Sequence, residues 1–122
     1  MNTLFLVTLI IETIFGLGFI FAPAKMLEPY GVILNDPAAI TFARLFGSAI
    51  IGFPVLLCLA RKSENIDFKK ATVYTLLTYY FLSGIVLAIT QTAGLMNSLG
   101  WAIVGLHLIF VIWFGYYSIK AK

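Results

Sequence analysis

The sequence predicts an all-α protein, an antiparallel bundle of four helices that span a membrane, with both termini on the cytoplasmic side. The chain of 122 residues is 61% hydrophobic and only 11% charged, whereas soluble domains are roughly 45–50% apolar and about 25% charged. Its mean hydropathy is +1.02. Apolar stretches of about 20 residues, the length that crosses a hydrocarbon core of ~30 Å as a helix, occur at four places in the chain.

The first predicted span covers residues 3–22 and ends before Pro23. The triplet Ala22-Pro23-Ala24 is similar to the cleavage site of a signal peptide. However, no Lys or Arg precedes the apolar region, and Glu12 interrupts it. We therefore interpret the segment as a retained helix.

The connection that follows is too apolar to extend into water. We expect a short interfacial helix over residues 25–28, followed by a turn at Pro29-Tyr30-Gly31. The second span is predicted over residues 38–60, because Asp36 is a favourable N-cap and Pro37 fits the first helical position.

A proline inside the second span predicts a bend. Pro54 has no backbone N–H, so the carbonyl of Ile50 loses its usual helical partner. The third and fourth spans are predicted over residues 71–92 and 98–118, and Asn97-Ser98 opens the fourth. The halves share no repeated motif, so residues 1–122 are predicted to form a single domain.

The positions of Lys and Arg predict the orientation. Six of these residues lie in the middle connection and at the C-terminus, and Lys25 alone lies in the opposite connections. The positive-inside rule then places both termini in the cytoplasm of a multi-pass membrane protein. The six residues are Arg61, Lys62, Lys69, Lys70, Lys120 and Lys122.

The same composition argues against several classes of function. The positive charges follow the predicted topology, so the net charge of +3 does not predict a nucleic-acid partner. Cys58 is the only cysteine, which excludes an internal disulfide and a Cys-ligated metal centre within this chain. His107 is the only histidine and lacks a second metal ligand, so neither a metal nor another cofactor is predicted.

Ionisable residues inside the predicted spans are the candidate site. Measured from the outer helix ends, Arg44 is roughly 9–10 Å deep, His107 roughly 14 Å and Glu12 roughly 15 Å. We therefore predict a shared polar layer in which Arg44 and Glu12 form an ion pair or bind a ligand. Small and polar side chains at helical spacing are predicted to line this layer: Thr8, Gly16, Thr41, Ser48, Tyr80 and Gln91.

Each of these residues has a second interpretation. The Arg44–Glu12 pair can serve only to hold two helices in register, or Arg44 can extend its side chain towards lipid headgroups. His107 can be a neutral side chain that forms a hydrogen bond in the core. The aromatic residues are interpreted as residues that pack the helices together, rather than as a cofactor-binding site.

Three segments carry a resemblance that covers nearly the whole chain. They are FGLGFIFAPAKMLEPYGV, ARLFGSAIIG and GLMNSLGWAIVGLHLIFVIWFGYYSIKAK. In this order the chain resembles small bacterial four-helix membrane proteins of unknown function, broadly DoxX-like in size. The resemblance implies a four-helix fold and a location in a bacterial inner membrane, not an activity. It assigns no role to His107.

Glu12 in LIIETIFG carries a second resemblance, to the small multidrug resistance transporters, which have a membrane-embedded glutamate in their first helix. It implies proton-coupled exchange of a cationic drug at Glu12. The strong Lys/Arg bias and the positive charge of Arg44 argue against this function.

These features predict a non-catalytic membrane module rather than an enzyme. We expect its polar layer to bind a lipophilic or anionic small molecule or a partner helix, and its surface to contact membrane lipids. Three alternatives stay open: a transporter that uses Glu12, an enzyme that acts on a lipid or quinone through His107, and an accessory subunit of a larger membrane complex. A homo-oligomer is compatible with each.

Overall fold

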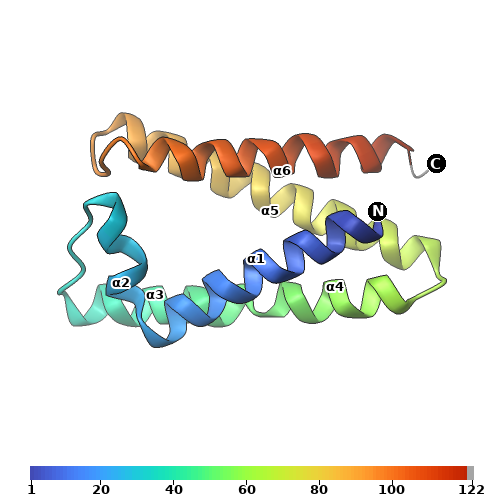
Figure 1. The fold of residues 1–122 in the computed structure, drawn as a ribbon, viewed down its shortest axis with the longest axis horizontal. Coiled ribbons are helices and arrows are strands. Elements are labelled where there is room, and N and C mark those ends of the chain that lie inside the picture. Colours follow the sequence, from blue (N-terminus) through green and yellow to red (C-terminus); the bar gives the residue numbers. More distant parts are fainter. Residues whose placement is uncertain (121–122) are drawn as a thin grey trace. The chain divides into compact units, whose positions relative to one another are not determined.

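The computed structural model describes residues 1–120, and within them it contains helices and loops but no β-strand (Figure 1). The all-α prediction is confirmed. Of the described residues, 2–59 form one compact unit, and 60–120 with Met1 form a second. Four segments are long and apolar enough to cross a membrane: Asn2–Phe21, Pro37–Lys62, Ile66–Thr92 and Gly100–Lys120.

The first unit begins with α1 (Asn2–Phe21), α2 (Pro23–Leu27) and the 3₁₀-helix η1 (Glu28–Tyr30). Gly31 ends this segment with φ of 76°, a left-handed conformation that glycine adopts without strain. The short helix α2 begins two residues before the predicted start at Lys25, and the turn ends at Gly31 as predicted.

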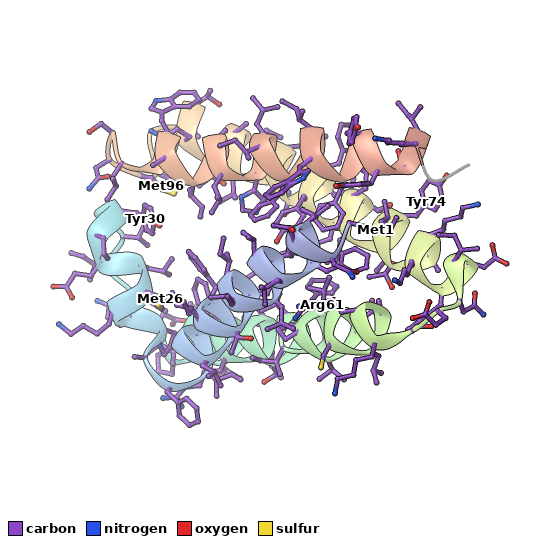
Figure 2. The ribbon with its side chains drawn as sticks, turned by 45° about the vertical axis from the view of Figure 1, so that its right-hand side comes forward. Met1, Met26, Tyr30, Arg61, Tyr74 and Met96 are labelled. Atoms are coloured by element: carbon purple, nitrogen blue, oxygen red, sulfur yellow. The ribbon has the colours of Figure 1, made fainter. Side chains whose placement is uncertain are left out.

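The short helix α2 folds back on the end of α1. Met26, labelled in Figure 2, packs against Gly18: a Cβ on Gly18 would lie 2.9 Å from the Cγ atom of Met26. On the exposed side of the same segment, Lys25 Nζ donates a hydrogen bond of 2.9 Å to the Glu28 carboxylate. The hydrogen bond and the charge of this carboxylate raise the pKa of Lys25 above its usual value.

The second long segment consists of α3 (Pro37–Ile50) and α4 (Gly52–Lys62). Its start follows the prediction, because the Asp36 carboxylate accepts a hydrogen bond of 2.8 Å from the Ala39 amide and Pro37 is the first helical residue. The two helices are separated at Ile51, next to the carbonyl of Ile50 that Pro54 leaves without its helical donor.

A close contact between two glycines joins α1 and α3, which run antiparallel (Figure 1). A Cβ on Gly47 would lie 2.8 Å from the carbonyl oxygen of Gly16. Phe19 and Phe46 meet beside this contact, edge to face, with ring centroids 5.4 Å apart. The missing side chains let the two backbones approach closely, as small residues do in membrane helices.

The second unit is an antiparallel pair, α5 (Ile66–Thr92) and α6 (Gly100–Lys120). Helix α5 begins five residues before the predicted start, because Asn65 caps it by accepting hydrogen bonds from the amides of Asp67 and Phe68. Helix α6 begins at Gly100, two residues after the predicted start. The side chain of Asn97 accepts a hydrogen bond from the Leu99 amide just before it.

The turn between α5 and α6 depends on Gly94, whose φ is 73°. The Gly94 amide donates to the carbonyl of Gln91 at 3.1 Å, and the Leu95 amide donates to the carbonyl of Thr90 at 3.3 Å. This pair of bonds is a Schellman motif, which satisfies carbonyls at the end of a helix and requires a left-handed residue.

Candidate functional site

One face of α1 carries buried polar residues. Thr8 is 0% exposed and Glu12 is 4% exposed. Gly16, one turn further along the same face, is also buried and contacts α3. Thr8 and Glu12 are separated by four residues, so their side chains project from the same side of α1, one turn apart.

The hydroxyl of Thr8 differs from those of other threonines in these helices. Thr13, Thr72 and Thr90 donate to the carbonyl four residues earlier, at 2.7 to 2.9 Å. Thr8 Oγ1 is buried and has no hydrogen-bond partner among residues 1–120. Burial of a hydroxyl without a partner costs free energy, so Thr8 is a local weakness in the packing.

Arg44 lies on α3 next to two hydroxyl side chains. Thr41, Arg44 and Ser48 are all exposed on this helix. The Thr41 hydroxyl donates to the carbonyl of Pro37 at 2.9 Å, and the Ser48 hydroxyl donates to the carbonyl of Arg44 at 3.0 Å. We call Thr41, Arg44 and Ser48 the α3 polar stripe.

The register between α1 and α3 determines the height of Arg44 relative to Glu12. Phe19 of α1 contacts both Phe46 and Gly47 of α3. Because the helices run antiparallel, Arg44 lies at the height of Phe19 or nearer to the C-terminal end of α1. Phe19 follows Glu12 by seven residues, so Arg44 and Glu12 are separated along the helix axes by about 10 Å or more at ~1.5 Å per residue. The α1–α3 packing therefore does not bring these two side chains together.

His107 lies in the second unit, inside a group of aromatic rings. It is 8% exposed, and its Nδ1 is 2.9 Å from the carbonyl oxygen of Ile103. A carbonyl only accepts, so Nδ1 is the donor in this contact. The Tyr80 ring is 5.5 Å from the His107 ring, and it stacks on Phe110 at 4.6 Å between centroids.

Gln91 has a structural position at the α5–α6 turn. Its Nε2 donates a hydrogen bond of 3.1 Å to the carbonyl of Asn97, and its side chain fills the space above Gly100. Its Oε1 is buried without a hydrogen-bond partner in the described part of the chain. Gln91 therefore holds the turn closed.

The residues predicted to form the polar layer lie on elements of both units. Glu12, Thr8 and Gly16 form a buried stripe on α1, while His107 and Tyr80 lie among the aromatic rings of the second unit. Within residues 1–120, no three His, Cys, Asp or Glu side chains are grouped as metal ligands.

The sequence analysis missed a further feature, on the outer face of α6. A groove of about 400 Å³ is lined by four side chains on that helix. Beside it, Lys120 Nζ donates a hydrogen bond of 2.7 Å to the Tyr116 hydroxyl and lies 5.2 Å from the centre of the Tyr116 ring. Helical spacing is the only sequence signal for this groove, whose residues are Ile109, Ile112, Trp113 and Tyr116.

Comparison of the chain with protein-family models, with curated proteins and with solved structures finds no match.

Proposed function

We propose that this chain is a multi-pass protein of a bacterial inner membrane, with both termini in the cytoplasm. The four long apolar helices support insertion into a membrane. The charge distribution supports the orientation, because Lys25 lies in the connection between the first two spans and Arg61, Lys62, Lys69 and Lys70 lie around the next connection.

Within that membrane, the protein is a non-catalytic module that binds an anionic amphiphile at Arg44, meaning a molecule with a phosphate or carboxylate head and a hydrocarbon tail. The observation that carries this proposal is the exposure of Arg44 within an apolar span. A guanidinium in that position is costly unless it meets an anion or reaches the polar headgroups.

The depth of Arg44 fits a headgroup ligand. The span Pro37–Lys62 has 26 residues, so it is about 39 Å long and exceeds a ~30 Å hydrocarbon core by about 4–5 Å at each end when it is centred. The Cα atom of Arg44 is then about 6 Å below the hydrocarbon boundary. A long arginine side chain bridges most of that depth towards the headgroups.

The neighbours of Arg44 define what it binds. A guanidinium holds a phosphate or a carboxylate with two parallel hydrogen bonds. The hydroxyl groups of Thr41 and Ser48 already donate to backbone carbonyls. Within the α3 polar stripe, Arg44 is therefore the residue that supplies hydrogen-bond donors to an anion. Phe42 and Leu45, which are 71% and 58% exposed, provide apolar surface next to it for a hydrocarbon tail.

The test is lipid retention by the purified full chain in a mild detergent, followed by native mass spectrometry. After titration with phosphatidylglycerol, we expect Arg44→Gln to bind at least one tightly held lipid fewer than the wild-type chain. Lys25→Gln is the matched control, because this exposed lysine is already paired with Glu28. Equal lipid retention by Arg44→Gln and the wild-type chain would refute the proposal. It would also be refuted if Arg44→Gln lost a protein partner that cross-links to the wild-type chain while it retained the same number of lipids.

The burial of Glu12 favours one alternative, a proton-coupled transporter. Glu12 is 4% exposed in the most apolar of the four spans, whose mean hydropathy is 2.4. A carboxyl in such a place can exchange a proton for a cation. In proteoliposomes with a pH gradient, this alternative requires uptake of a lipophilic cation that Glu12→Gln abolishes and Arg44→Gln does not. Absence of uptake by the wild-type chain would exclude it.

A further inference from the structure

The outer face of α6 combines an apolar groove with a cation at one end. The groove is lined by Ile109, Ile112, Trp113 and Tyr116, at helical spacings of three and four residues. The lining residues cover about two turns of α6. Tyr116 is the residue of the groove nearest to Lys120.

The cation is held in place at the end of this groove. Lys120 Nζ donates to the Tyr116 hydroxyl at 2.7 Å and lies over the Tyr116 ring, 5.2 Å from its centre. The Tyr117 ring meets the Tyr116 ring edge to face, at 5.2 Å between centroids. Tyrosine side chains are typical of the level where hydrocarbon meets headgroups, so Lys120 lies at the level of the lipid phosphates.

The start of α5 brings further positive charge to the same end of the unit. The Tyr74 hydroxyl, labelled in Figure 2, donates to the carbonyl of Ser118 at 3.4 Å and fixes the register of the two helices. In this register Lys70, one turn before Tyr74, lies within about one helical turn of Lys120 along the axis. Lys69 is its neighbour, and both lysines are half-buried.

We infer that the groove and the three lysines form a binding site for one anionic phospholipid, independent of the Arg44 site. An acyl chain lies along the groove beside Trp113, and the phosphate and its anionic headgroup lie between Lys120 and the start of α5. The positive charges of the lysines favour an anionic headgroup. The apolar side chains that line the groove favour a hydrocarbon tail. Each lysine contributes roughly a fivefold preference for an anionic surface.

The chain carries its own reporter for this site. Trp113 lines the groove, and the only other tryptophan is Trp101. Trp101→Phe therefore gives a full-length protein whose tryptophan emission comes from the groove. A bromine on a lipid acyl chain quenches this emission when the chain lies against the indole. The probes are brominated phosphatidylglycerol and brominated phosphatidylcholine, each in vesicles that otherwise contain unbrominated phosphatidylcholine.

In the Trp101→Phe protein, we expect brominated phosphatidylglycerol to reach half-maximal quenching at a mole fraction at least tenfold lower than brominated phosphatidylcholine. Replacement of Lys69, Lys70 and Lys120 by Gln should remove this preference and leave the maximal quenching unchanged. Lys25→Gln, at an exposed site outside this unit, should keep it.

Equal quenching by the two lipids in the Trp101→Phe protein would overturn the inference. A preference that survives the triple replacement would also overturn it. All three lysines lie near helix ends, so their replacement could unfold part of a helix. Circular dichroism of the triple variant shows whether the helices are retained. If that variant unfolds, Lys120→Gln alone should lower the preference about fivefold, and an unchanged preference would again overturn the inference.

Discussion

Gly47 lies so close to Gly16 that a methyl group on Gly47 would be 2.8 Å from the Gly16 carbonyl oxygen and 2.9 Å from the backbone nitrogen of Ile20. Both of these atoms belong to the backbone of α1, so no side chain can rotate to make room. The contact between α1 and α3 therefore depends on glycine at position 47.

Gly47→Ala should destabilise the protein by roughly 1–3 kcal/mol, the usual range for overpacking a close contact. The measurement is the free energy of unfolding in mixed detergent micelles, followed by circular dichroism. Gly16→Ala should cost less, because its added methyl meets mainly the end of the Ile51 side chain. Gly115→Ala is the control, since a Cβ there meets no atom within 4 Å. Equal stability of all three variants would contradict the prediction.

Gly94→Ala should destabilise the second unit through its backbone. The φ of 73° at Gly94 costs an L-residue about 1–2 kcal/mol, and the Schellman bonds at the end of α5 depend on this conformation. The same unfolding measurement tests this. Gly105→Ala, within α6 with open space around it, should instead be neutral or stabilising by up to about 1 kcal/mol. A Gly94 variant as stable as the Gly105 variant would refute this account.

Thr8→Val should stabilise the protein or leave it unchanged. The variant keeps the shape of the side chain and removes a buried hydroxyl that has no partner among residues 1–120, whose burial costs about 1–3 kcal/mol. Thr72→Val is the matched comparison, because Thr72 is equally buried but donates to the Phe68 carbonyl at 2.9 Å. It should lose up to about 1 kcal/mol. A loss on Thr8→Val larger than on Thr72→Val would show that the hydroxyl has a binding partner in the membrane.

The proposed orientation predicts which connections are accessible from outside the cell. In a Cys58→Ser background, Asn35→Cys should react with a membrane-impermeant maleimide in intact cells, because the connection after η1 faces outwards. Glu64→Cys should react only after the membrane is permeabilised. Both native side chains are exposed, so burial does not confound the comparison. The reverse pattern of labelling would contradict the orientation.

Local features of the fold were predictable from the sequence because short-range chemistry determines them. Asp36-Pro37 combines an N-cap with a proline at the first helical position, and α3 begins there. The turn at Pro29-Tyr30-Gly31 also lies where it was predicted. The start of α5 was missed because the segment from Ile66 to Lys70 is polar and resembles a loop, although Asn65 caps a helix there.

The environment of Arg44 was not predictable in the same way. The predicted ion pair with Glu12 relied on depths counted separately from each helix end. The structure instead sets the relative height of α1 and α3 at Gly16 and Gly47, a long-range contact that leaves no periodic signal in the sequence. The environment of His107 depends on α5 as well as α6, so α6 alone could not predict it.

The interruption at Ile51 gives the second span a mechanical property. Helices bend most easily where a backbone hydrogen bond is missing, and Pro54 removes the donor for Ile50 at this level. Helix α3, which carries Arg44, packs against α1 at Gly47. Helix α4 is connected to α3 through the interruption at Ile51, where bending is easiest. A displacement of the Lys62 end can therefore tilt α4 without moving the part of the segment that carries Arg44.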